Sequence, residues 1–160
     1  MGDISDLEAI VHISTAGMPK SQVDVVMGEQ YNRKVLQSHE KNIENIWSQR
    51  LTQNPRLYNG SKFRLDSWKC ENNSVLTLYL GLTCYRDYLA TNWSPDVKRL
   101  HQIGKRDYGN QQAYMSDPLG VAAMVQTADD CFIFIRRSNN VGEAAGLWDV
   151  PGGHPEPEVC

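Results

Sequence analysis

The 160-residue chain is 41% hydrophobic, enough to form one core of ordinary domain size. Its net charge of -3 comes from interspersed acidic and basic residues, without a lysine- or arginine-rich run, so we expect no nucleic-acid partner. No apolar run approaches the roughly 18 residues needed to span a bilayer, so we expect a soluble protein with no membrane partner.

The N-terminus reads "MGDISDLEAI", which is acidic and has no apolar segment of the kind that marks a secretory signal. The same residues are too acidic for a typical mitochondrial transit peptide. We therefore expect an intracellular protein, located in the cytoplasm or the nucleus.

Four cysteines are widely spaced and form no C-x-x-C pair: Cys70, Cys84, Cys131 and Cys160. This spacing argues against a zinc knuckle and against a thioredoxin-like dithiol, so we expect free thiols. Because Cys131 begins the apolar run "CFIFI", we expect it to be buried as a small hydrophobic residue.

The first third of the chain predicts strands followed by a helix. The runs "AIVHIS" (9–14) and "VDVVM" (23–27) are rich in β-branched residues and are followed by turn-forming residues, which indicates strands. In "SHEKNIENIWSQRL" (38–51), apolar residues recur at helical spacing. Ser38 is the predicted N-cap of this helix, and Trp47 is predicted to lie in the core.

The middle third predicts a hairpin and then a short helix. In "KFRLDSWK", "ENNS" and "VLTLYLGLT", two strands flank a turn, because leucines alternate with other residues in the second strand. "SPDVKRLHQIG" follows as a helix of about two turns. We expect Ser94 at its N-cap, Pro95 at its first position and Gly104 just beyond its end.

The last third begins with "LGVAAMVQTADDCFIFIRRS", which predicts two apolar strands around the turn "TADD". The second strand ends in two arginines, Arg136 and Arg137. Such a pair is either solvated surface or, next to the glycine-rich loop that follows, a contact for a phosphate.

That loop carries the sequence "GLWDVPGGHPEPE". The order of hairpin, arginine, loop and Trp-x-Val-Pro-Gly-Gly resembles the strand and entry loop of the Nudix hydrolase superfamily. The strings "GLTCYRDYLATNW", "DYGNQQAYMSDPLGVAA" and "RRSNNVGEAAGLWDVPGGHPEPE" are similar to one branch, the UDP-glucose and UDP-galactose diphosphatases. The resemblance extends over nearly the whole chain and is strongest from Phe63 onward.

The resemblance implies an α/β fold, the Nudix α/β/α sandwich around a mixed sheet. Residues 1–115 would form a family-specific, β-rich N-terminal segment, and residues 116–160 would begin the Nudix hydrolase domain. The implied reaction is hydrolysis of a UDP-sugar to UMP and sugar 1-phosphate. The implied cofactor is Mg2+, a hard cation that neutralises charge on the diphosphate and orients the attacking water.

In the family, the metal ligands are glutamates on the helix of the box G-x5-E-x7-R-E-U-x-E-E-x-G-U. Gly152 and Glu158 match the first spacing, and Cys160 precedes the "REUxEE" part. We therefore expect a C-terminally truncated fold with no catalytic residue or metal ligand of its own. Relatives in this branch carry extra residues before the helix, so the alternative is that the Glu158 match is accidental.

The resemblance also implies contacts to the uridine and the sugar. They fall on seven residues: Tyr58, Tyr85, Arg137, Gly142, Asp149, His154 and Glu156. The tyrosines could stack on or hydrogen-bond a uracil or ribose, and Arg137 could bind a phosphate through two N–H groups. Asp149 and Glu156 could accept sugar hydroxyls, and His154 could donate to a phosphate oxygen. The alternatives are that Asp149 caps a turn and that Glu156, between two prolines, is simply exposed.

Two functions stay open at this point. One is a UDP-sugar diphosphatase, and the other is a catalytically inactive short form that binds UDP-sugar weakly or interacts with other proteins. In either case we expect residues 121–135 to expose apolar side chains and an unpaired strand edge, and the isolated chain to be partly molten or oligomeric.

Overall fold

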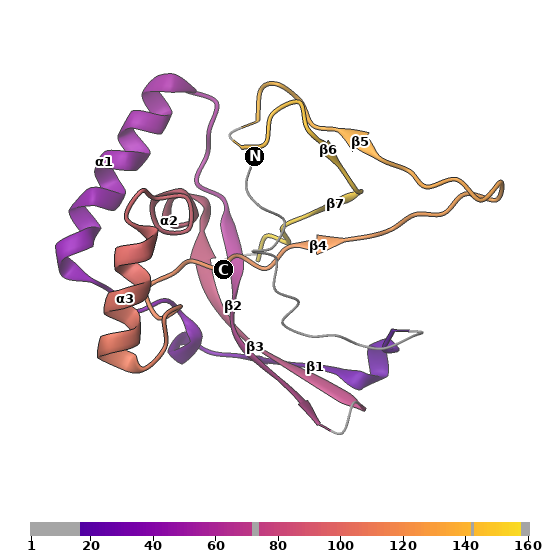
Figure 1. The fold of residues 1–160 in the computed structure, drawn as a ribbon, viewed down its shortest axis with the longest axis horizontal. Helices are drawn as coiled ribbons and strands as arrows, with labels where there is room; N and C mark the ends of the chain where they lie inside the picture. Colours follow the sequence, from indigo (N-terminus) through magenta and orange to yellow (C-terminus); the bar gives the residue numbers. More distant parts are fainter. Residues whose placement is uncertain (1–16, 72–73, 142, 158–160) are drawn as a thin grey trace.

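The computed structural model describes residues 17–71, 74–141 and 143–157 (Figure 1). The predicted strand 9–14, Gly142, Glu158 and Cys160 lie outside these residues. The elements in chain order are η2 (Lys20–Gln22), β1 (Val23–Met27), η3 (Glu29–Tyr31), α1 (Gln37–Gln53), β2 (Ser61–Glu71), β3 (Val75–Cys84), α2 (Tyr85–Thr91), α3 (Val97–Tyr108), β4 (Val121–Ala122), β5 (Ile135–Arg136), β6 (Trp148–Asp149) and β7 (Gly152–Gly153). No helix in the described ranges is long and apolar enough to cross a membrane.

The main sheet has three strands in the order β1-β3-β2. The strands β2 and β3 pair antiparallel along nearly their whole length, which confirms the predicted hairpin. The strand β1 pairs parallel with β3, so the predicted strand "VDVVM" is also confirmed. A bulge interrupts the β2–β3 ladder between Leu65 and Ser67. Helices and a mixed sheet together confirm the expected α/β class.

The three helices gather at one end of this sheet (Figure 1). The helix α1 begins at Gln37 rather than at a Ser38 cap, because the carbonyl of Leu36 already accepts backbone hydrogen bonds from the first turn. Its Ile43 is buried, whereas Trp47 is only half-buried, so the prediction of a core tryptophan is wrong. The Trp47 ring instead contacts Tyr85 of α2 edge-on, with 6.4 Å between ring centroids.

The helix α3 is longer than predicted and continues past Gly104 to Tyr108. A Cβ at Gly104 would lie 2.7 Å from the carbonyl oxygen of Asn110, so glycine is needed there for close packing and not for a helix end. The helix ends at Gly109, whose φ of 67° is left-handed. The predicted Ser94 cap is also wrong, since Asp96 holds that position and the Ser94 hydroxyl accepts its backbone N–H.

A buried arginine attaches residues 112–117 to the sheet. Arg64 of β2 is 1% exposed and donates to the backbone carbonyls of Met115, Gln112 and Tyr31. Its guanidinium also pairs with Asp66 at 2.6 Å. Next to it, Leu100, Tyr114 and Met115 form a buried apolar cluster. This part of the molecule therefore has an enclosed core.

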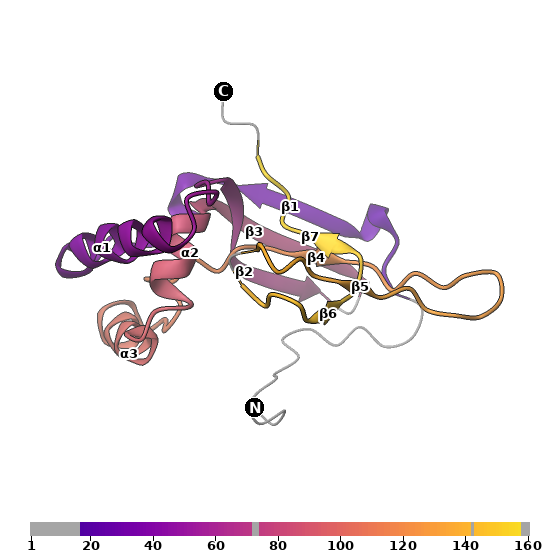
Figure 2. The ribbon, with the colours of Figure 1, turned by 90° about the horizontal axis from the view of Figure 1, so that it is seen from above.

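The last third extends away from that core as an open arm (Figure 2). The turn at Thr127–Asp130 and the bridge between Gln126 and Phe132 fit the predicted hairpin. Nearer the sheet the two sides separate, because β4 pairs with β7 and β5 pairs with β6. The prediction that β4 and β5 pair with each other is therefore wrong. Instead, β5 pairs with the later strand "WD" (β6), and β4 pairs with the later strand "GG" (β7).

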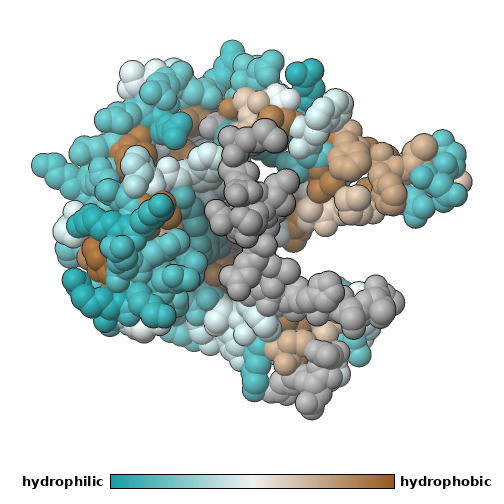
Figure 3. Space-filling view, viewed as in Figure 1, coloured by the Kyte–Doolittle hydropathy of each residue, from teal (hydrophilic) through white to brown (hydrophobic). Residues whose placement is uncertain are grey.

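The arm exposes apolar side chains, as expected, and its brown surface stands out in Figure 3. The exposed residues include Val121, Met124, Phe132, Ile133, Phe134 and Ile135. Cys131 is exposed near the tip, so the prediction that it is buried is wrong. The reason is that nothing in the described part of the chain packs over this end of the arm. Cys70, Cys84 and Cys131 are free thiols, as predicted.

Candidate functional site

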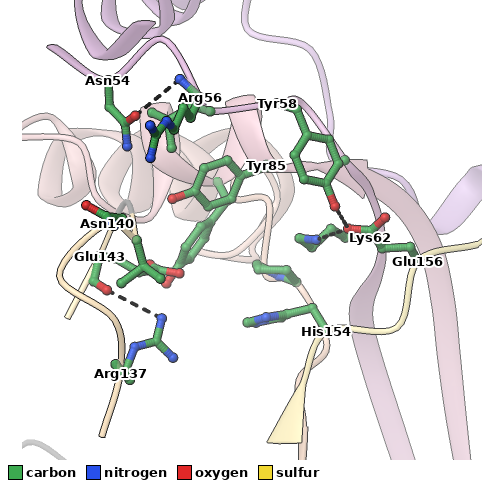
Figure 4. A pocket seen from close by; sticks show the side chains of 15 residues that line it. Asn54, Arg56, Tyr58, Lys62, Tyr85, Arg137, Asn140, Glu143, His154 and Glu156 are labelled. Carbon is green, nitrogen blue, oxygen red and sulfur yellow. Dashed lines mark hydrogen bonds and ion pairs between the residues drawn. The ribbon is translucent and has the colours of Figure 1, made fainter. Parts of the chain in front are cut away.

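A cavity of about 440 Å3 lies between the helical end of the molecule and the last third (Figure 4). Its size is within the usual range of small-molecule sites. Five of the seven predicted site residues line it: Tyr58, Tyr85, Arg137, His154 and Glu156. Tyr58 lies in the loop that precedes β2, and Tyr85 begins α2. The other three lie in the last third, so the cavity is built by two regions distant in sequence.

One wall is a polar cluster around Glu156. The Tyr58 hydroxyl donates to Glu156 Oε1 at 2.7 Å, and the Lys62 ammonium contacts the same oxygen at 3.1 Å. These hydrogen bonds lower the pKa of Glu156, and the carboxylate raises the pKa of Tyr58. A Cβ at Gly60 would lie 2.6 Å from Glu156 Oε1, so glycine there permits this close approach. Glu156 is exposed, but it is held in place by two partners.

A second part of the lining is aromatic. Tyr85 and Tyr88 are one helical turn apart on α2, with 6.2 Å between their ring centroids. Burial raises the pKa of Tyr85 and raises that of Tyr88 to about 12. Both phenols therefore stay neutral near pH 7. Each ring offers an apolar face together with a hydroxyl group, a combination suited to a nucleobase or a sugar.

Arg137 is the cation that the last third contributes to the site. Its Nη1 contacts Asp149 Oδ2 at 3.0 Å, and its Nη2 donates to the carbonyl oxygen of Glu143 at 3.4 Å. Its Nε is buried without a hydrogen-bond partner among the described residues. Asp149 lines an adjoining cavity, where its Oδ1 accepts the backbone N–H of Val150. The Asp149 side chain, at the end of β6, thus accepts the next backbone N–H and also orients Arg137.

His154 follows β7 and lines both the main cavity and a neighbouring one of about 740 Å3. Its ring centroid is 6.5 Å from that of Tyr88. The main cavity also has lining residues that the sequence prediction missed, among them Arg56, Lys62, Tyr88, Asn140 and Glu143. Tyr88 could have been found from its spacing of three residues after Tyr85 on a helix. Nothing local in the sequence distinguishes Lys62 or Glu143.

The carboxylates near the cavity do not form a metal site. The part of the chain that the structure describes contains no group of three or more His, Cys, Asp or Glu side chains placed to hold an ion. Glu156 is bound by Tyr58 and Lys62, and Asp149 is bound by Arg137. No metal-dependent step is therefore assigned to these residues.

A mixed sheet with an aromatic and cationic cavity is the arrangement of an α/β protein with a small-molecule site. Over 158 residues, 96% of its length, the chain is 44% identical to uridine diphosphate glucose pyrophosphatase NUDT22 of Bos taurus. It is 47% identical over 146 residues to the Mus musculus protein of that name and 38% identical over 151 residues to Nudix hydrolase 9 of Arabidopsis thaliana, covering 89% of the chain in both cases. No model of a protein family matches the chain.

This homology confirms the resemblance to the Nudix hydrolase superfamily, in its UDP-glucose pyrophosphatase branch. The chain covers 54% of the Bos taurus protein, 47% of the Mus musculus protein and 48% of the Arabidopsis thaliana protein. It therefore spans about half the length of these relatives.

Proposed function

We propose that this chain supplies the substrate-binding part of a Nudix-type UDP-sugar diphosphatase. The reaction would convert UDP-glucose or UDP-galactose and water to UMP and the sugar 1-phosphate. The observation that carries the proposal is that Tyr58, Tyr85, Arg137, His154 and Glu156, distant in sequence, line one cavity. The names of the similar proteins point to the same substrate class.

The lining chemistry suits the three parts of such a ligand. The Tyr85 and Tyr88 rings offer a surface on which a uracil can stack. Arg137 presents a guanidinium to an anionic oxygen, and His154 offers a further donor for the diphosphate. Glu156 and Lys62, at the other side of the cavity, can accept from and donate to sugar hydroxyls.

Further parts of the proposal concern the whole enzyme. Mg2+ is the proposed metal, and it would neutralise charge on the diphosphate and orient the attacking water. Its ligands would be the glutamates of the Nudix helix and not the described carboxylates. Residues 1–115 are proposed as the family-specific segment and residues 116–160 as the start of the Nudix hydrolase domain. We further propose that the protein acts inside the cell.

Calorimetric titration with UDP-glucose tests the proposal. We expect Arg137→Ala to weaken binding by about 1.5 to 3 kcal/mol, the usual size of a hydrogen bond to a charged group. The matched control is Arg136→Ala, because Arg136 is the exposed neighbour and does not line the cavity. Equal affinities of the two variants, or a wild-type chain that binds no UDP-glucose, would contradict the proposal.

A further inference from the structure

Glu143 is a cavity residue to which neither the family resemblance nor the proposed function gives a role. It lies in the loop between β5 and β6 and is half-buried. Its carboxylate oxygen Oε2 is buried and has no hydrogen-bond partner among the described residues. A buried polar atom without a partner is unusual in a folded protein and calls for an explanation.

Glu143 lies near both the aromatic wall, proposed for the base, and Arg137, proposed for the phosphate. After burial, the charge of Glu143 contributes to the raised pKa of Tyr85 and of Tyr88, and hydrogen bonding between Glu143 and Tyr88 raises that of Tyr88 further, so the carboxylate lies beside the aromatic wall. Its own carbonyl oxygen accepts a hydrogen bond from Arg137 Nη2. Figure 4 shows Glu143 between Tyr85 and Arg137. A group in this place adjoins the surface proposed for the base and the cation proposed for the phosphate.

We propose that Glu143 binds the ribose hydroxyls of a nucleoside diphosphate, an inference that rests on the proposed function. The ribose is the part of the ligand that joins base to phosphate, so it must cross the space between Tyr85 and Arg137. A carboxylate has two acceptor oxygens and can accept from neighbouring hydroxyls, as acidic residues do for ribose in dinucleotide sites. Glu143 would thus distinguish ribonucleotides from deoxyribonucleotides.

The uracil ring is a less suitable partner for this carboxylate. Uracil offers a single N–H donor on its hydrogen-bonding edge, and carbonyl oxygens flank that donor on both sides. The second carboxylate oxygen would then face another acceptor, which is unfavourable. Two adjacent ribose hydroxyls present two donors and no such conflict.

The test is calorimetric titration of the 160-residue chain with UDP and with 2′-deoxy-UDP. We expect the wild-type chain to bind UDP more tightly by about 10-fold, the effect of one hydrogen bond to a charged group. Glu143→Gln should lose most of that preference, mainly through weaker binding of UDP. Glu29→Gln removes one negative charge from η3, which does not line the cavity, and should retain the preference.

The possible outcomes distinguish the role of Glu143 from the proposed function. If the wild-type chain binds both ligands equally, or if Glu143→Gln retains the preference, the role of Glu143 is wrong and the proposed function stands. If the wild-type chain binds neither UDP nor UDP-glucose, the proposed function fails and the role of Glu143 fails with it. The comparison of two ligands on the wild-type chain needs no variant, so poor folding of Glu143→Gln does not weaken it.

Discussion

The helical end of the molecule and its last third differ in how deeply their side chains are buried. Around Arg64 and Leu100, side chains are almost fully enclosed and backbone carbonyls have buried donors. From residue 121 to residue 136, the apolar side chains are largely exposed and the strands are two residues long. The candidate site lies between these regions. One region supplies the aromatic wall together with Arg56 and Lys62, and the other supplies Arg137, Glu143, His154 and Glu156.

This difference predicts that stability and binding can be changed separately. Substitutions in the enclosed region should lower the free energy of unfolding. Substitutions of Arg137 or Glu143 in the last third should chiefly change affinity for the nucleotide.

The largest effect should come from Arg64→Met. This change removes the donor to the backbone carbonyls of Met115, Gln112 and Tyr31, and among the described residues only that of Gln112 keeps a backbone partner, the N–H of Met115. It also removes the ion-pair partner of Asp66, and we expect a loss of about 3 to 5 kcal/mol in the free energy of unfolding, measured in urea. Arg99→Met, at an exposed position on α3, is the control and should stay within about 0.5 kcal/mol. A small loss for Arg64→Met would mean that Arg64 does not anchor residues 112–117.

A pair of truncations compares the two regions directly. Leu100 is 0% exposed, so Leu100→Ala should leave a cavity and lower the free energy of unfolding by about 2 to 5 kcal/mol. Phe134 is 52% exposed, so Phe134→Ala should lower it by much less, although the side chain removed is larger. Equal losses in urea titrations would show that Phe134 is covered in solution and that the arm is not an open region.

The sequence predicted the enclosed region well where the pattern is local. Alternating leucines predict β3, and helical spacing around Ile43 predicts α1. The end of α3 was missed because glycine has two uses. At Gly104 it permits close approach of the backbone near Asn110, which only the tertiary structure shows, whereas Gly109 supplies the left-handed residue that ends the helix.

In the last third, the sequence predicted the residues that line the cavity better than it predicted the pairing of the strands. Arg137 and His154 line the cavity, and the motif that identified them is contiguous. The pairing of β4 with β7 was missed, since two-residue strands of valine, alanine and glycine carry no periodic pattern. Lys62 was missed because it lies on β2, and only the fold brings it to the cavity. Glu143 lies within the motif itself, but the resemblance gave it no role.

The smallest expected effect concerns the contact that joins the two regions, between Glu156 and Tyr58. Because hydrogen bonds from Tyr58 and Lys62 lower the pKa of Glu156 in the folded chain, this contact favours the folded state above the ordinary pKa of a glutamate. That contribution should disappear as the pH falls through the lowered pKa, when the carboxylate takes up a proton.

In NMR titrations, the pKa of Glu156 should be below its usual value of 4.5 in the wild-type chain and return toward 4.5 in Tyr58→Phe, which lacks the donor hydroxyl. Tyr108→Phe, an exposed tyrosine on α3 that does not line the cavity, is the control and should leave the titration unchanged. An unshifted Glu156 in the wild-type chain would mean that the last third is not held against Tyr58 in solution, and the site would then form only when a ligand brings the two regions together.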